Sequence, residues 1–151
     1  MKKYSKILIV ILVFISTFFT SCVTTISAIK ENPQKFAGKT LDIKGTVTNV
    51  INVPFTEFQV FLFADDNSKT AVFSISNHKK EETFILSGLV VTFPENATND
   101  TADAAAKSLS DYIIKMDLAK PDKVKKIAGI ILGVIRTISK GLGGEFFIIE
   151  Q

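Results

Sequence analysis

The chain has 151 residues, 46% hydrophobic and 22% charged, which is enough for one domain with a buried core. Its formal net charge of +3 comes from the segment before Cys22, which holds Lys2, Lys3 and Lys6 and no acidic residue, so 15 basic and 15 acidic residues remain after it. Because nonspecific nucleic-acid binding relies on basic residues that neutralise phosphates, this balance argues against a nucleic-acid partner. Cys22 is the single cysteine, which excludes an internal disulfide.

The first 21 residues have the organisation of an export signal. Met1–Lys6 is basic, and a mostly apolar run follows from Ile7 to Phe19. A membrane-spanning helix needs roughly 20 apolar residues, so this run is short for a permanent anchor and typical of a cleaved signal peptide. An uncleaved signal-anchor is the alternative interpretation.

The end of this segment, Phe19-Thr20-Ser21-Cys22, resembles the lipobox of bacterial lipoproteins. The resemblance implies cleavage between Ser21 and Cys22, attachment of diacylglycerol to the Cys22 thiol, and acylation of the new N-terminus, for example by palmitate. Phe19 stands where the family prefers Leu, and Thr20 is less usual than Ala or Ser. We therefore expect a lipid-anchored protein of the cell envelope, facing the periplasm or the exterior, with no cofactor beyond this lipid.

The next part of the sequence predicts a tether and then a β-rich region. Residues 22–28 are expected to be a tether, and Ile29–Phe36 a helical turn that Pro33 breaks. Alternating apolar and polar residues then predict a half-buried strand, in which Gly45 indicates a bulge or a sharp bend. Three more runs predict strands over Glu57–Ala64, Lys69–Ser76 and Thr83–Phe93. Short turns between the strands are typical of an antiparallel meander.

After these strands the pattern becomes helical. One helix is predicted over Ala102–Met116, and Pro121 is expected to begin a second helix that runs to about Lys140. Gly129 and Gly133 in the second helix have a spacing that would allow close helix packing. A final apolar run predicts a closing strand over residues 145–150.

The segment from Asn32 to Val47 resembles the opening of exported bacterial OB-fold domains. The shared features are Asn32-Pro33, the aromatic Phe36, Gly38-Lys39, and Gly45-Thr46-Val47. The resemblance covers about residues 29–94 and 144–150. It implies a mainly β fold with an α insert (β+α), in which residues 29–151 form a five-stranded OB-fold-like antiparallel barrel with two helices inserted between strands 4 and 5, at about residues 100–140.

OB-folds commonly bind ligands on the face of strands 2 and 3. Four phenylalanines on these two strands are candidates for a ligand face on which bases or sugars would stack: Phe58, Phe61, Phe63 and Phe73. Packing into the core is the alternative for all four. The long insert could also cover this face.

The second helix is basic and amphipathic, which favours either a membrane surface or a partner protein. Its candidate contact residues are Lys123, Lys126, Ile127, Ile131 and Arg136. Burial of the apolar stripe against the sheet is the alternative.

The sequence predicts no catalytic constellation and no metal site. His78 has no nucleophile motif beside it and is expected to be a solvated loop residue, while Asp65-Asp66-Asn67 is expected to form a hairpin turn. The expected function is therefore a non-enzymatic binding or interaction module that contacts the membrane through its lipid and an envelope protein, a small ligand or a glycan through its barrel. The alternative is a structural component of an envelope assembly that docks through the helical insert.

Overall fold

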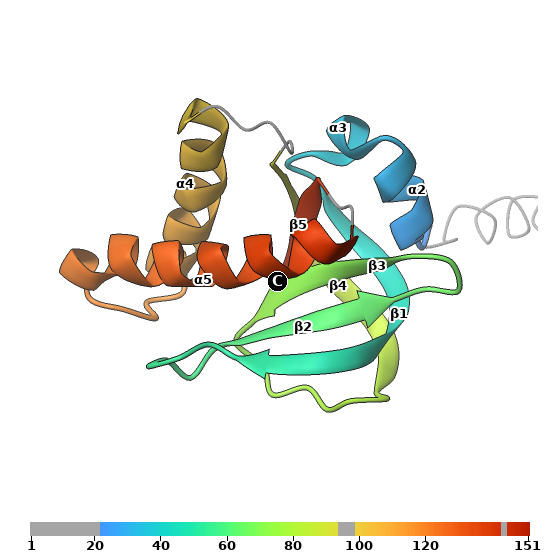
Figure 1. The fold of residues 1–151 in the computed structure, drawn as a ribbon, viewed down its shortest axis with the longest axis horizontal. Helices are drawn as coiled ribbons and strands as arrows, with labels where there is room; N and C mark the ends of the chain where they lie inside the picture. The colour runs from blue at the N-terminus through green and yellow to red at the C-terminus, as the bar shows by residue number, and fades with distance from the viewer. Residues whose placement is uncertain (1–21, 94–98, 143–144) are drawn as a thin grey trace, which may run out of the picture.

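The computed structural model describes residues 22–93, 99–142 and 145–151, which form a closed five-stranded β-barrel accompanied by helices (Figure 1). The strands are β1 (Thr40–Asn52), β2 (Gln59–Ala64), β3 (Lys69–Ser74), β4 (Thr83–Thr92) and β5 (Phe146–Glu150). The helices are α2 (Ile26–Glu31), α3 (Pro33–Phe36), α4 (Asn99–Lys115) and α5 (Pro121–Leu142). The predicted combination of a β-barrel with helices is thus confirmed.

The strands close in the order β1-β2-β3-β5-β4, and β4 returns to β1. The β3–β5 pair is parallel, whereas the other pairs are antiparallel. An OB-fold-like class is compatible with this arrangement. Closure pairs every strand on both sides, which removes the exposed edges that an open sheet would present.

One hydrophobic cluster fills the inside of the barrel. Side chains alternate along each strand, so every second residue of β2, β3 and β5 points inward, including Phe61, Val72 and Ile148. Helix α2 covers one end of the barrel, because its Ile26 and Ile29 are fully buried in the same cluster.

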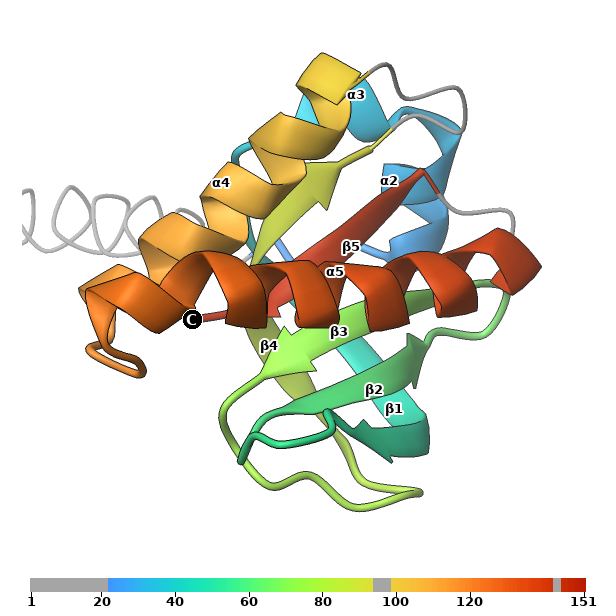
Figure 2. The same ribbon diagram turned by 60° about the vertical axis from the view of Figure 1, so that its left-hand side comes forward.

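A second hydrophobic cluster lies between the barrel and the two long helices. The buried residues of α5 recur at helical spacing along one face: Val124, Ala128, Ile131, Leu132, Ile135 and Ser139. This face packs on the outer side of β3 and β2, and α4 packs against α5 (Figures 1 and 2). The outward-facing residues of the same strands, such as Phe73, are buried there.

Gly45 does not mark the bulge that the sequence predicts at this position. The pairing of β1 with β4 continues in register through Gly45, and the irregularity of β1 lies between Val47 and Asn49. Gly45 instead makes room for a neighbour, because a Cβ atom at this position would lie 2.8 Å from the Phe63 ring and 2.7 Å from the carbonyl oxygen of Ala64. Close approach of the chain therefore explains this glycine.

Candidate functional site

Cys22 lies at the start of the described chain and is exposed. The predicted signal segment 1–21, including Ser21 before the predicted cleavage site, lies outside the described residues. The backbone amide of Thr24 donates to the carbonyl oxygen of Asp42 at 2.8 Å, and Thr24 forms a parallel bridge with Ile43. The chain is therefore folded from Thr24 onward, and only Val23 lies between this contact and Cys22.

The predicted tether over residues 22–28 is thus replaced by structure. Thr25 is the N-cap of α2, where its hydroxyl accepts from the amide of Ala28 at 3.1 Å, and Ile26 is buried in the barrel. The physical reason is hydrophobic: Ile26 and Ile29 stand three positions apart on one helical face and close the open end of the barrel. The sequence pattern was too short to show this face.

The four phenylalanines of the expected ligand face lie in two different cores. Phe61 and Phe63 are fully buried inside the barrel, whereas Phe58 and Phe73 pack under the helices, with a ring-centroid distance of 5.6 Å between them. Phe61, Phe63 and Phe73 are fully buried, and Phe58 is 8% exposed where it borders the β1–β2 loop, so the four rings form no stacking platform and core packing describes them. The reason is that α5 covers the outer face of β2 and β3 while strand alternation turns the other two rings inward.

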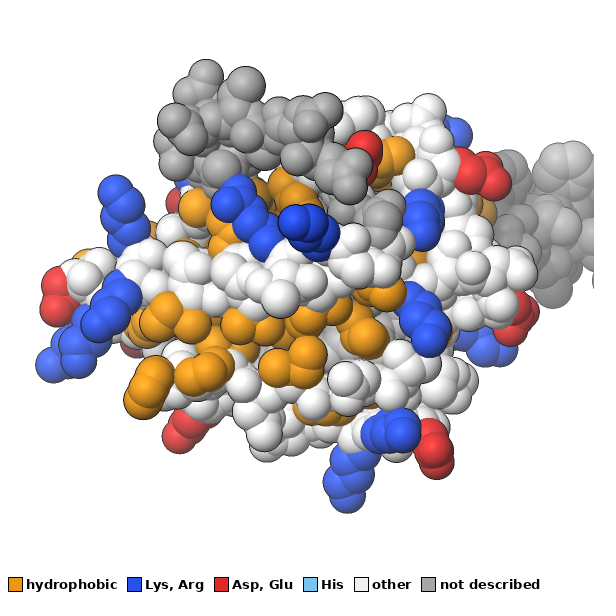
Figure 3. Space-filling view, in the orientation of Figure 1, with side chains coloured by type: hydrophobic (Ala, Val, Ile, Leu, Met, Phe, Trp, Pro, Cys, Tyr) orange, Lys and Arg blue, Asp and Glu red, His pale blue; other side chains and the backbone are white. Residues whose placement is uncertain are grey.

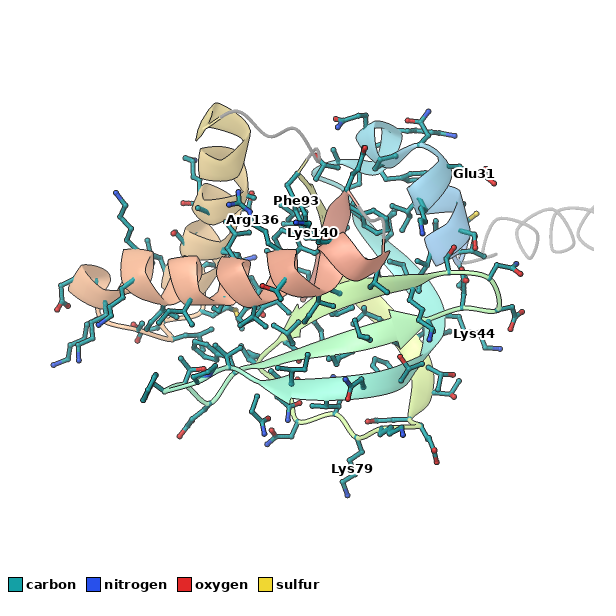
Figure 4. All side chains as sticks on the ribbon, viewed as in Figure 1. Glu31, Lys44, Lys79, Phe93, Arg136 and Lys140 are labelled. Atoms are coloured by element: carbon teal, nitrogen blue, oxygen red, sulfur yellow. The ribbon has the colours of Figure 1, made fainter. Side chains whose placement is uncertain are left out.

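The candidate residues on α5 divide between its buried face and its exposed faces. Ile131 is fully buried and Ile127 is half-buried against the helical core, whereas Lys123, Lys126 and Arg136 are exposed. Arg136 and Lys140 extend from the side of α5 nearest α4 and Phe93 (Figure 4). The buried Ile131 is unavailable to a membrane or partner, while the charged residues are accessible.

Half-buried apolar residues form a second accessible feature of α5. We call this the α5 flank, and its members recur at helical spacing: Ile127, Ile130, Val134 and Ile138. Apolar atoms gather along the edge of α5 that faces β2 (Figure 3). Gly129 and Gly133, whose spacing would allow close helix packing, are both exposed, and a Cβ atom at either would meet none of the described residues within 4 Å.

His78 is not the solvated loop residue that the sequence predicts. Its side chain is 11% exposed, and its ring stacks on Phe84 with a centroid distance of 4.6 Å. The Nε2 atom lies 3.0 Å from Oε1 of Glu150, and Nδ1 lies 3.4 Å from Oε2 of Glu82. The hydroxyl of Ser74 donates to the other oxygen of Glu150. No local sequence pattern indicates this cluster, because its members lie on β3, on β5 and in the connection between β3 and β4.

The order of contacts in this cluster determines its chemistry. The Glu150 carboxylate lies between the Ser74 hydroxyl and the His78 ring, so the imidazole does not contact the hydroxyl as a base must in order to activate a nucleophile. The cluster instead joins β3, β5 and the β3–β4 connection.

Burial raises the pKa of the nearby Tyr112 phenol, and the charge of Glu150 raises it further. Among the described residues, no group of three His, Cys, Asp or Glu side chains is placed to hold a metal ion.

Asp65 has a structural role in the turn between β2 and β3. Its carboxylate accepts from the backbone amides of Ser27, Asn67 and Ser68 at 3.0, 3.0 and 2.7 Å. Burial alone would raise the pKa of Asp65, but these hydrogen bonds outweigh it and hold the pKa below its ordinary value. The residue thus forms the expected hairpin turn and also ties that turn to α2.

Several grooves indent the described surface, and two of them lie beside the barrel ends. The loop groove adjoins the β1–β2 loop, has a volume of about 510 Å³ and is lined by Asn52, Thr56, Glu57, Phe58, Ile75 and Asn77. The anchor groove lies near the N-terminal end of the described chain, has a volume of about 360 Å³ and is lined by Thr25, Lys44, Gly45, Thr46, Ala64, Asp65, Asp66 and Thr83. Both are built from loops and strand ends that only the closed barrel brings together, so sequence reasoning did not find them.

The β1–β2 loop beside the loop groove carries an unusual aromatic residue. Phe55 is fully exposed and has φ of 63°, a conformation that bulky side chains rarely adopt. The loop is closed by hydrogen bonds from the amide of Val53 to the carbonyl of Phe58 at 2.9 Å and from the Thr56 hydroxyl to the carbonyl of Val53 at 2.9 Å. These bonds hold the strained residue in place and present its ring to solvent.

Comparison with known proteins gives no relative from which a role could be transferred. No protein-family model, no curated protein and no solved structure matches the chain. Within the described ranges, none of the helices combines the length and apolar character needed to cross a membrane.

Proposed function

We propose that this protein is a bacterial envelope lipoprotein, held on a membrane by a lipid on Cys22, whose barrel acts by binding rather than by catalysis. The observation that carries the proposal is the position of Cys22: the thiol is exposed and lies two residues before the first folded contact, made by Thr24. A lipid can therefore be attached there without disturbing the barrel. Two or three acyl chains would give lasting anchorage, whereas one gives only marginal binding.

The loop groove is the recognition surface that fits this proposal best. The helices cover the outer face of β2 and β3, whereas the groove at the β1–β2 loop is open. It combines an apolar wall, Phe58 and Ile75, with the amide and carboxylate groups of Asn77 and Glu57, as ligand sites commonly do. Its partner would be an envelope protein, a small ligand or a glycan.

The anchor and the loop groove lie at opposite ends of β1. Thr24 pairs with Ile43, and the strand continues to Asn52, roughly 30 Å along the chain at about 3.3 Å per residue. Helix α2 follows Cys22 closely in the chain. In both ribbon views it lies on the side of the molecule opposite the α4–α5 turn (Figures 1 and 2). A lipid on Cys22 would thus leave the β1–β2 loop facing away from the membrane.

The mass of the protein recovered from its native membrane tests the anchor. We expect a mature chain that begins at Cys22 and whose N-terminal peptide carries the mass of diacylglycerol and a further acyl chain. A Cys22→Ser variant should remain uncut and unacylated. An unmodified chain that begins at Met1 would refute the lipoprotein assignment and leave the segment Ile7–Phe19 as an uncleaved anchor.

The α5 flank supports a second candidate, a structural component that docks in an envelope assembly through its helices. Apolar residues remain half-exposed there, and Ile114 and Met116 near the end of α4 are exposed. A photo-crosslinking residue at Phe55 or at Ile130, in cells that make the full chain, separates the candidates. Crosslinks from Phe55 alone favour recognition at the loop groove, and crosslinks from Ile130 alone favour docking through the helices.

A further inference from the structure

We propose that the anchor groove binds a phosphate group linked to a primary amine, as in a phosphoethanolamine headgroup of the membrane that holds the protein. The inference rests on the proposed function for the source of this ligand. It depends on three observations: where the groove lies, which of its charges lack partners, and which hydroxyl hydrogens can be donated.

The groove lies next to the attachment point of the lipid. The parallel bridge between Thr24 and Ile43 sets Thr25 beside Lys44, and both residues line the groove. The chain from Cys22 to Thr25 spans at most about 10 Å. Lys44 extends on the side of the molecule where the described chain begins (Figure 4). A lipid on Cys22 would therefore bring the groove to the depth of neighbouring headgroups.

Two opposite charges in the groove have no partner among the described residues. Lys44 and Asp66 are both exposed, and neither takes part in an ion pair or a side-chain hydrogen bond with the described residues. Asp65, which also lines the groove, is already engaged by the amides of Ser27, Asn67 and Ser68. Lys44 is thus the cation and Asp66 the carboxylate available to a ligand.

The threonines supply a hydrogen-bond donor beside Lys44. The hydroxyls of Thr46 and Thr83 are 2.7 Å apart, so one of them donates to the other. The accepting hydroxyl keeps its own hydrogen for another acceptor. A phosphate oxygen is a suitable acceptor, because the ammonium of Lys44 lies on the same strand and would neutralise its charge.

The ligand class follows from this set of groups. A bare anion would use Lys44 and a threonine but would be repelled by Asp66 and by the ionised Asp65, and a bare cation would be attracted by both carboxylates but repelled by Lys44. A molecule with a phosphate at one end and an ammonium at the other satisfies both charges. At about 30 Å³ per water-sized group, the groove of about 360 Å³ has room for a phosphoethanolamine group.

Titration with glycerophosphoethanolamine tests the inference without requiring the lipid on Cys22. The full chain, purified in an uncharged sugar detergent, is titrated while amide resonances of Thr25, Lys44 and Thr46 are followed by NMR. We expect saturable shifts of these resonances, with at least tenfold weaker binding for Lys44→Gln and for Asp66→Asn. Lys79→Gln is the matched control, because Lys79 is an exposed lysine in the β3–β4 connection, outside the anchor groove (Figure 4).

Two ligand comparisons make the test specific. Glycerophosphocholine should bind more weakly, because its quaternary ammonium cannot donate a hydrogen bond to Asp66, and inorganic phosphate should not compete at equal concentration. Absence of shifts, equal binding of inorganic phosphate, or an unchanged Asp66→Asn variant would each overturn the inference.

A vesicle experiment identifies the source of the ligand. Protein in vesicles of phosphatidylglycerol and phosphatidylethanolamine should show the same shifts, whereas phosphatidylcholine in place of phosphatidylethanolamine should not produce them. Shifts with the soluble probe but not with the vesicles would overturn the assignment of the ligand to a membrane lipid. The groove would then bind a free phosphorylated amine. Because the soluble titration does not depend on acylation, an unacylated Cys22 would refute the proposed function and leave that titration valid.

Discussion

At the scale of single residues, Gly45 is held by close packing rather than by a special backbone angle. A Cβ atom there would meet the Phe63 ring at 2.8 Å and the Ala64 carbonyl oxygen at 2.7 Å. We expect Gly45→Ala to lower the free energy of unfolding by about 1–3 kcal/mol, since the interior must shift to admit a methyl group. Chemical denaturation measured by circular dichroism gives this value.

Gly129→Ala is the matched control for this prediction. Gly129 lies in α5, and an added Cβ atom would have no neighbour within 4 Å. Alanine should therefore stabilise the protein by about 0.5–1 kcal/mol through its higher helix propensity. Equal effects of the two substitutions would contradict the packing explanation for Gly45.

Asp65 should make stability depend on pH. Its folded-state pKa lies below the ordinary value of 3.8, so its contribution is fully present above that value and is lost as the pH falls through the folded pKa. Asp65→Asn should cost about 1 kcal/mol at neutral pH, as removal of a cap does, and should flatten the loss of stability below about pH 4. Thermal unfolding between pH 2 and pH 7, with Asp66→Asn as the control, checks both effects; a wild-type acid profile in Asp65→Asn would disprove them.

At the scale of elements, the contact between the helices and the sheet is a principal source of stability. Phe73 on β3 is fully buried, and its ring meets Phe58 and Tyr112 edge-on at centroid distances of 5.6 and 5.9 Å. Phe73→Ala should therefore lower the free energy of unfolding by about 3–5 kcal/mol. Urea denaturation followed by circular dichroism measures the loss.

Phe55→Ala is the matched control, because it removes a phenylalanine ring from an exposed loop instead of from the core. Because Phe55 is fully exposed, its loss should change the free energy of unfolding by no more than about 0.5 kcal/mol. If both variants lost stability equally, the exposed position of the β1–β2 loop would be refuted. We therefore expect that Phe55 can be altered in binding experiments without unfolding the barrel.

At the scale of the whole molecule, the proposed lipid on Cys22 is joined to the barrel by a short connection, which should fix the orientation of the barrel on a membrane. The chain contains no tryptophan, so one introduced tryptophan reports its own surroundings. In vesicles with brominated acyl chains, we expect strong quenching of fluorescence for Val23→Trp and little for Phe55→Trp, because β1 separates the two positions. Equal quenching at the two positions would refute this orientation.

Local patterns in the sequence were sufficient for most elements. Residue alternation predicted the first strand, apolar runs predicted the other strands, and the predicted start of the second helix at Pro121 is confirmed. The predictions of a tether over residues 22–28 and of a solvated His78 were wrong. Burial of Ile26 and the approach of Glu150 to His78 both depend on residues far away in the chain. A local sequence pattern depends only on residues within a few positions of one another.

The sequence by itself was sufficient to predict the strands and the two long helices, to indicate Cys22 as the candidate lipid site and to give the balanced charge that remains after it. Only the tertiary structure decided that the phenylalanines of β2 and β3 are covered, that Thr24 begins the folded domain, and that Lys44 and Asp66 share a groove. The physical reason is barrel closure. It joins strands that are distant in sequence, and it alone decides which side chains are buried and which remain available to a ligand.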